Sequence, residues 1–197
     1  TLYSTEGSSL ALRTMLALAL SRAPRIPGER PLLLAARNAH KSLLYAAALL
    51  DFDIAWIYPE DTALDSICSC HPSPNSVRAA LRALPRPPFA VFLTSPDYLG
   101  FLADIQGIVT AVDACCGAGS VPVLVDNAHG AYLHFLETPM HPMDQGAYLC
   151  CDSAHKTLPV LTGGAYLHFS AEAAAEVGAS ARRTMELFAS TSPSYLI

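Results

Sequence analysis

The chain contains two lysines, Lys41 and Lys156, beside ten arginines. Lys156 lies in the stretch CCDSAHKTL (residues 150–158), directly after an apolar run and beside His155. Arginine stays protonated at any working pH, whereas a desolvated lysine can lose its proton and attack a carbonyl as a free amine. The position therefore suits a Schiff base to a carbonyl-bearing cofactor, and the competing interpretation is a solvated loop lysine.

Three other groups have residue types that suit a cofactor. The stretch STEGSS (residues 4–9) precedes a predicted helix, and Gly7, Ser8 and Ser9 would place N–H and hydroxyl donors at its N-terminus, as an anion site or as an ordinary cap. Asp126 ends an apolar strand, where a carboxylate needs a cation or a strong donor unless it caps a turn. The ring of His40 follows another strand and would stack on a ligand or cap a turn.

An alternation of strands and helices must position these groups. Short apolar runs that lack polar alternation, joined by helices, are typical of a mostly parallel sheet covered on both faces. The sequence therefore predicts a three-layer α/β/α domain with a mostly parallel mixed sheet. The expected strands are 31–36, 54–58, 89–93, 121–125, 147–151 and 164–169, and the expected helices are 8–21, 41–50, 76–84, 104–116 and 171–189, with a loop over 61–75.

Ligands of such sheets bind at the carboxyl ends of the strands. Polar, chemically capable residues follow four of the predicted strands, and a sheet built only for packing would not need them. These residues are Arg37, Asn38 and His40; Thr94, Ser95 and Tyr98; Asp126, Asn127 and His129; and Asp152, Ser153, His155 and Lys156.

Composition excludes several classes of protein. The chain is 52% hydrophobic and 15% charged with a net charge of −5, which argues against disorder and against nucleic-acid binding. No apolar run is long enough to span a bilayer, so no membrane partner is expected. The six cysteines occur in close pairs, mostly in apolar segments, which indicates reduced thiols in a cytoplasmic protein. Cys68, Cys70 and His71 are an alternative zinc interpretation, but they are more crowded than the usual spacing of paired cysteine ligands, and no metal is expected.

These four groups are the ones that bind pyridoxal 5'-phosphate: a helix N-terminus for the phosphate, a ring that stacks on the cofactor, a carboxylate for the pyridine nitrogen and an amine for the aldehyde. The sequence also resembles the Orn/Lys/Arg decarboxylase family over nearly its whole length. The resemblance rests on ARNAHKS (36–42), LTSPDYLG (93–100), VDNAHGAYLHF (125–135), DSAHKTLPVLTGGAYLH (152–168) and STSPSYLI (190–197), in the family's order. It implies the large domain of a fold-type-I pyridoxal-phosphate enzyme that decarboxylates arginine, lysine or ornithine to an amine and CO2.

The resemblance also implies roles for individual residues. Lys156 would form the Schiff base, Asp126 would bind the pyridine nitrogen, and His40 would stack on the ring. Gly7, Ser8, Ser9 and Ser153 would hold the phosphate, and His129 and His155 would lie beside the cofactor. Departures from the family pattern are Glu6, Tyr132 and Pro159, and they bear on the substrate more than on the cofactor.

Other interpretations remain open at this level. Another fold-type-I reaction, such as aminotransfer or carbon–sulfur or aldol cleavage, would use the same cofactor set, and a non-catalytic relative would keep the fold for assembly or ligand sensing. We expect residues 1–197 to be an incomplete large domain, inactive alone, that lacks an upstream segment and a C-terminal small domain. The resemblance implies a homo-oligomer and a small amino-acid substrate, for whose basic side chain Asp97 and Glu137 are candidate partners.

Overall fold

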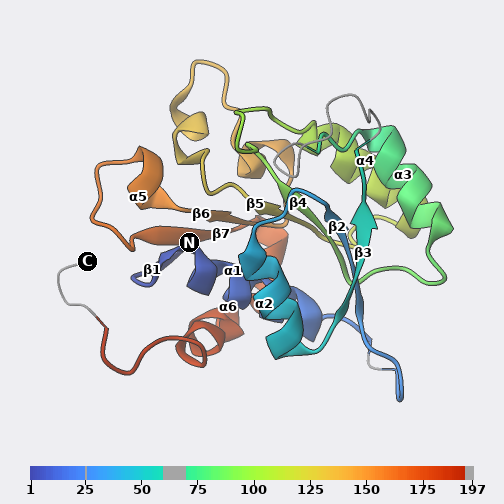
Figure 1. Ribbon diagram of the computed structural model, residues 1–197, viewed down its shortest axis with the longest axis horizontal. Helices are drawn as coiled ribbons and strands as arrows, with labels where there is room; N and C mark the ends of the chain where they lie inside the picture. The colour runs from blue at the N-terminus through green and yellow to red at the C-terminus, as the bar shows by residue number, and fades with distance from the viewer. Residues whose placement is uncertain (25, 60–69, 194–197) are drawn as a thin grey trace.

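The sheet of this protein carries helices on both faces (Figure 1). The computed structural model describes residues 1–24, 26–59 and 70–193. In this part of the chain the sheet has seven strands in the order β1-β7-β6-β5-β4-β2-β3. The strands are β1 (Leu2–Ser4), β2 (Leu32–Ala36), β3 (Asp53–Ile57), β4 (Ala90–Thr94), β5 (Val123–Asp126), β6 (Leu149–Asp152) and β7 (Ala165–Phe169).

Strands β2 to β6 are parallel to one another, whereas β7 is antiparallel to β6 and β1 is antiparallel to β7. The helices are α1 (Gly7–Ser21), α2 (Lys41–Leu50), α3 (Pro74–Ala83), α4 (Ile105–Cys116), α5 (Ala154–Thr157) and α6 (Ala171–Glu186), with 3-10 turns η2 (Ala131–Phe135) and η3 (Pro142–Gln145). The prediction of a three-layer α/β/α domain with a mostly parallel mixed sheet is confirmed.

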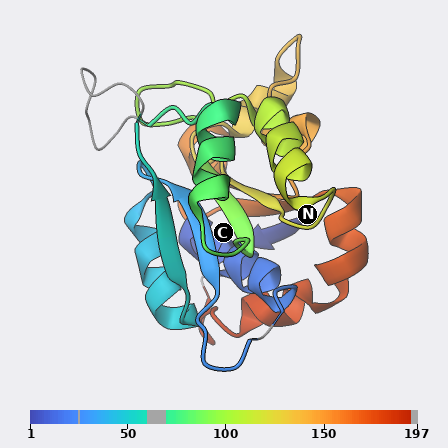
Figure 2. The ribbon, with the colours of Figure 1, turned by 90° about the vertical axis from the view of Figure 1, so that its right-hand side faces the viewer.

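Two apolar cores lie on the two faces of the sheet. Helices α1, α2 and α6 cover one face, while α3 and α4 lie side by side on the other (Figure 2). Helix α1 is buried on most of its circumference because it contacts the sheet, α2 and α6 together. This explains why its sequence is apolar all round, where a helix with one solvated face would show an apolar stripe.

The predicted strands and helices are all present, and no end is displaced by more than three residues. Strand β1 and the short elements η2, η3 and α5 were not predicted. Three to five residues are too few to show a period, and β1 exists because its backbone pairs with β7. The prediction that Ser8 and Ser9 cap α1 is wrong: the N-cap is Glu6, and both serines lie in the first helical turn.

Several predictions fall wholly or partly on residues 60–69 and 194–197, outside the described residues. These are most of the loop 61–75, Cys68 of the zinc interpretation and the end of STSPSYLI. The five described cysteines are all free thiols. No described helix combines the length and apolar character that crossing a membrane requires.

Candidate cofactor site

The carboxyl ends of the central strands meet at one edge of the sheet. Asp126 ends β5 and Asp152 ends β6, and these two strands are parallel neighbours. Because β7 reverses direction and β1 reverses it again, Ser4 at the end of β1 reaches the same edge. The start of α1, the loop after β5 and the turn containing Lys156 are thus brought together from distant parts of the chain.

Five of the predicted site residues line a single pocket at this edge: Ser8, His40, Asp126, His129 and Lys156. Leu12, Ser42, Tyr98 and Ala128 complete its walls. The pocket volume is about 40 Å³, which is too small for a pyridine ring and a phosphate. The side chains of Lys156 and Tyr98 are exposed, so both can move outward to enlarge it.

Asp126 is a buried carboxylate with weak partners. Its Oδ1 accepts the backbone N–H of Ala128 at 3.2 Å and the Cys151 thiol at 3.7 Å, and it forms no ion pair with the described residues. Burial raises the pKa of Asp126, although the Ala128 N–H, Lys156, His40 and the thiol oppose the rise. A carboxylate in this state retains acceptor capacity for a cationic N–H donor.

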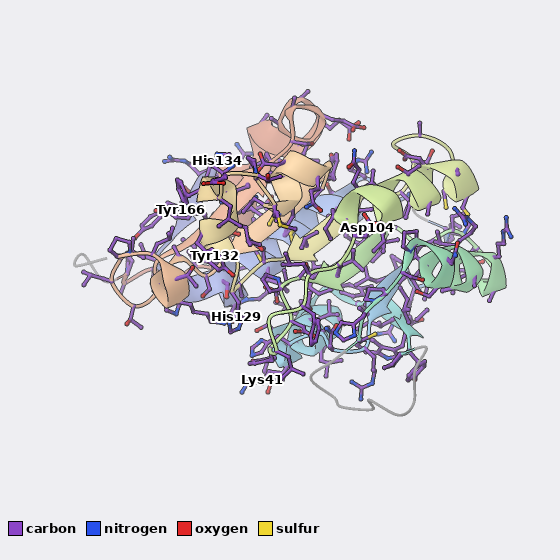
Figure 3. The ribbon with its side chains drawn as sticks, turned by 90° about the horizontal axis from the view of Figure 1, so that it is seen from above. Lys41, Asp104, His129, Tyr132, His134 and Tyr166 are labelled. Carbon is purple, nitrogen blue, oxygen red and sulfur yellow. The ribbon has the colours of Figure 1, made fainter. Side chains whose placement is uncertain are left out.

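Lys156 points toward His129. The Lys156 Nζ lies 3.1 Å from His129 Nε2, and the His129 ring contacts Tyr98 with ring centroids 5.2 Å apart. His129 and Tyr132 both follow β5 (Figure 3). Burial lowers the pKa of His129, and the charges of Lys156 and His40 lower it further. These effects favour the neutral imidazole, whose Nε2 can accept an N–H from the lysine.

His40 is the N-cap of α2, in agreement with the capping interpretation of this residue, and it also lines the pocket. Its Nδ1 accepts the backbone N–H of Ser42 at 3.3 Å and lies 2.8 Å from the Ser42 hydroxyl. The Ser42 hydroxyl in turn lies 2.9 Å from that of Ser9. These contacts hold the imidazole by one nitrogen and tie α2 to the first turn of α1.

The N-terminus of α1 can receive an anion. Gly7 has φ of +74°, a conformation that residues with a Cβ rarely adopt. The backbone N–H of Gly7 donates a hydrogen bond to Gly163 O at 2.7 Å. No side chain of the described residues caps this helix, so the N–H groups that follow Gly7 keep the donor capacity of a helix end. Glu6, a departure from the family pattern, accepts the backbone N–H of Ser190 at 2.6 Å.

Gly7, Ser9, Ser153 and His155 do not line the pocket. The backbone N–H of His155 donates to Gly164 O at 3.1 Å, and its Nδ1 lies 3.2 Å from the same oxygen. Ser153 Oγ is buried and has no hydrogen-bond partner among the described residues. An unpaired buried hydroxyl is costly in a finished site and is explained if an absent ligand supplies its partner.

Sequence reasoning missed several residues of this edge. Ser42 lines the pocket, and the one signal for it is its place two residues after His40 at a helix start. Asp152 was noted only as following a strand, and its partners His141 and His168 were not considered. Asp97 is buried and accepts the N–H groups of Leu99 and Phe101, which makes it an organiser of its own loop.

We predict that Gly130→Ala lowers the free energy of unfolding by about 2 kcal/mol. A Cβ at Gly130 would lie closer to Asn127 Oδ1 than van der Waals contact permits and 2.6 Å from Pro96 Cδ. Thermal unfolding would measure the loss. Gly178→Ala is the control, because the nearest atom to a Cβ there lies 3.9 Å away and mid-helix alanine should stabilise α6 by about 0.5 kcal/mol. Equal stability of the two variants would contradict the close packing around Gly130.

A larger cavity, of about 760 Å³, lies between the C-terminal ends of α1 and α2 and residues 26–31. It is at the amino end of β2, opposite the edge that carries Lys156. Its described lining contains proline, leucine and alanine with Arg86, Glu29 and Asp51, and no lysine, histidine or thiol. The described lining of the larger cavity therefore lacks the amine and imidazole groups that line the smaller pocket.

Comparison with solved structures defines the class of this fold. The lysine decarboxylase of Escherichia coli described as constitutive superposes with a TM-score of 0.71 at 24% identity, covering 98% of this chain and 27% of that one. The Oryza sativa TDC solved with PLP superposes with a TM-score of 0.67 at 19% identity, covering 88% and 38%. The fold is that of the large domain of fold-type-I pyridoxal-phosphate enzymes.

The family follows from the sequence comparisons. The family model described as "Orn/Lys/Arg decarboxylase, major domain" matches residues 1–197. An arginine decarboxylase of Halalkalibacterium halodurans is 32% identical over all of this chain and 37% of its own length, and the uncharacterised protein YaaO of Bacillus subtilis is 36% identical over 73% and 28%. The chain belongs to the Orn/Lys/Arg decarboxylase family, which confirms the resemblance. It spans about a third of the length of these curated relatives.

The residues present fit pyridoxal phosphate. Asp126 offers a buried carboxylate that forms no ion pair with the described residues, Ser153 a buried hydroxyl without a hydrogen-bond partner, and α1 an uncapped N-terminus. Lys156 is the one lysine that lines the pocket. A pyridine nitrogen, a phosphate and an aldehyde are the groups that would pair with this carboxylate, these donors and this amine.

Proposed function

We propose that the protein containing this chain is a pyridoxal-phosphate-dependent decarboxylase of a basic amino acid. The reaction replaces the α-carboxyl group of the substrate by a proton and releases an amine of the polyamine type and CO2. The observation that carries the proposal is the convergence of Lys156, Asp126, His129, His40 and Ser8 on one pocket in a chain of this family.

When bound, pyridoxal phosphate supplies an aldehyde that joins to amines and a pyridinium ring that accepts electrons from a breaking bond. Lys156 supplies the amine that would join to the aldehyde. Asp126 would accept a hydrogen bond from the ring nitrogen and keep it protonated, which would at the same time give this buried carboxylate a cationic partner. His40 would lie against the ring face and orient it.

The remaining residues hold the phosphate or handle protons. The first turn of α1, with Gly7, Ser8 and Ser9, would receive the phosphate, and Ser153 would add one hydrogen bond. His129 would orient the Lys156 amine by accepting one of its N–H bonds, since His129 Nε2 lies 3.1 Å from Lys156 Nζ. Lys156, or His155 beside it, would deliver the proton that replaces the carboxyl group.

We also propose that residues 1–197 are an incomplete cofactor-binding large domain, that the whole protein is a cytoplasmic homo-oligomer, and that the substrate is arginine, lysine or ornithine. Relatives named arginine decarboxylase make arginine the first substrate to test. Asp97 Oδ1 accepts two backbone N–H groups of its own loop and Asp97 Oδ2 lies 3.1 Å from His71 Nε2, so we do not retain Asp97 as a partner for the basic substrate.

The test combines trapping with a substrate panel. The full-length protein is incubated with pyridoxal phosphate, reduced with borohydride and mapped by peptide mass spectrometry, and parallel samples receive arginine, lysine or ornithine. Label on Lys156 with release of CO2 supports the proposal. Label on Lys156 with a keto-acid product indicates aminotransfer, and no label, or label on Lys41, favours a non-catalytic relative.

Ser153→Ala should weaken cofactor affinity by roughly tenfold, because the variant loses one hydrogen bond to the charged phosphate. The stability of the cofactor-free protein should not fall, because Ser153 Oγ has no partner to lose among the described residues. Fluorescence titration with pyridoxal phosphate and thermal unfolding measure the two quantities. Ser21→Ala, at the opposite end of α1, is the control. Unchanged affinity in Ser153→Ala would remove Ser153 from the phosphate site.

A further inference from the structure

A buried polar network surrounds Asp152, the last residue of β6. Its Oδ1 accepts the Asn127 amide at 2.7 Å, and its Oδ2 lies 3.0 Å from His141 Nε2 and 3.2 Å from His168 Nε2. The side chains of Asp152 and His141 are 4% and 5% exposed. The three donors come from the loop after β5, the residue before η3 and β7, so one carboxylate joins three separate segments.

The proton positions in this network are set by other contacts. His141 Nδ1 accepts the backbone N–H of Met143 at 3.2 Å, so His141 Nε2 must carry the proton that is donated to Asp152. The Asn127 amide must turn its nitrogen to Asp152, since the opposite orientation would set two oxygens against each other. His141 Nε2 and the Asn127 amide nitrogen therefore both donate to the carboxylate.

The ligand atoms of this cluster are spaced as in a metal site, but two of the groups are protonated and therefore cannot bind a metal. One atom each from His141, Cys150 and Asp152 lies within 4.8 Å of the others. A metal would need the lone pair of His141 Nε2, which the Met143 contact keeps protonated. Burial also raises the pKa of the Cys150 thiol, so the thiolate that binds metals is disfavoured. The cluster is a hydrogen-bond network.

Asp152 faces away from the cofactor pocket. Alternate residues of a strand point to opposite faces, and Leu149 and Cys151 lie in the core under α1 while Cys150 lies in the core under α3 and α4. Asp152 therefore shares the face of Cys150, whereas Asp126 shares the face of Leu124 and Cys151. His134 and Tyr166, labelled in Figure 3, are near this second face, where the His134 ring contacts that of His141.

The network nevertheless joins the two segments on which the proposed function depends. Asn127 directly follows Asp126, and Asp152 directly precedes the Ser153–Lys156 turn. The Asn127 backbone N–H also donates to Cys151 O at 2.9 Å, so that side chain and main chain make parallel links between the ends of β5 and β6.

We propose that Asp152 is a positioning residue that sets the Lys156 turn relative to Asp126 from the face of the sheet opposite the cofactor. It does so by binding Asn127, His141 and His168 simultaneously. The proposal rests on the proposed function, since it assigns Asp152 to the same site without contact to cofactor or substrate.

Asp152→Asn is the first test. The amide keeps the shape of the side chain but replaces one acceptor by a donor, so at least one of the three donors loses its partner. The rate at which pyridoxal phosphate is fixed on Lys156, read by borohydride trapping of the full-length protein, should fall by at least about tenfold, as expected for a small misplacement of reacting groups. The measurement is made at a temperature at which circular dichroism shows both proteins folded.

Asp144→Asn is the matched control. Asp144 is also paired with a histidine, His134 Nδ1 at 2.8 Å, but the pair is more exposed and neither residue adjoins Asp126 or Lys156. Asn127→Ala removes one donor only and is the deciding variant if Asp152→Asn does not fold. The double variant Asp152→Asn/Asn127→Ala should trap no more slowly than Asp152→Asn, because both changes break the same link.

The outcomes separate this inference from the proposed function. Wild-type trapping on Lys156 with slow trapping in Asp152→Asn and normal trapping in Asp144→Asn supports it. Wild-type rates in folded Asp152→Asn or Asn127→Ala overturn it while leaving the proposed function intact. Failure of the wild type to trap overturns both. Histidine NMR, which needs no cofactor, should show His141 protonated at Nε2, and protonation at Nδ1 alone would overturn the network itself.

Discussion

Lys156→Ala is expected to abolish covalent attachment of pyridoxal phosphate and to lower turnover by roughly 10⁴-fold, because the same amine is proposed to hold the cofactor and to transfer protons. The side chain is exposed, so folding should be unaffected. Borohydride trapping, decarboxylation rates and thermal unfolding would be measured together. A variant that still incorporated cofactor after reduction would show that another group forms the bond.

Two further variants define what the lysine contributes. Lys156→Arg keeps a positive charge beside His129 but cannot form the bond, so it should be as inactive as Lys156→Ala if chemistry, and not charge, is required. Lys41→Ala removes the other lysine, which lies exposed on the first turn of α2, and should retain trapping and turnover. Loss of trapping in Lys41→Ala with retention in Lys156→Ala would reverse the assignment.

Asp126→Asn should have opposite effects on activity and on stability. Turnover should fall by roughly 10³-fold, because the neutral amide cannot hold a proton on the ring nitrogen. The cofactor-free protein should become more stable at neutral pH, by about 1 kcal/mol, because the variant no longer buries a weakly partnered charge. Activity assays and thermal unfolding without cofactor would test the two halves separately.

The stability difference between Asp126→Asn and the wild type should depend on pH. Burial raises the pKa of Asp126 in the folded protein above its unfolded value, so its contribution to stability is complete below the unfolded pKa and is lost as pH rises through the folded pKa. The advantage of Asp126→Asn should therefore be absent in acid and grow toward neutrality. A loss of stability in the cofactor-free variant at pH 7 would show that Asp126 has a stronger native partner than Ala128 N–H.

Asp152→Asn is the matched comparison for stability. Burial by itself would raise the pKa of Asp152, but hydrogen bonds from His141 and His168 outweigh it and hold the pKa well below its usual range. Its stabilising contribution is therefore present at neutral pH and lost in acid. Removing that charge should destabilise the protein by about 3 kcal/mol, the opposite of the change expected for Asp126→Asn.

Much of the secondary structure could be predicted because its causes are local. Short apolar runs bounded by proline, glycine and polar residues mark strands of a covered sheet, and the helices between them are long enough to show composition and caps. Parallel strands place their carboxyl ends at one edge, so Asp126, His40 and Lys156 could be assigned to a common edge without coordinates. Strand β1 could not be found in this way, since its pairing with β7 spans more than 160 residues.

The two aspartates show where sequence reasoning ends. Asp126 and Asp152 each end an apolar strand and precede small polar residues, so they look alike in the sequence. The amino-acid order by itself determined the fold class, the family and the residue types at the sheet edge. Only the tertiary structure decided that Asp126 faces α1 with few partners while Asp152 faces the opposite core and binds His141 and His168. The face to which each aspartate points depends on its register in the strand, because successive side chains alternate between the two faces. The pKa of each aspartate depends on donors that folding brings from distant segments.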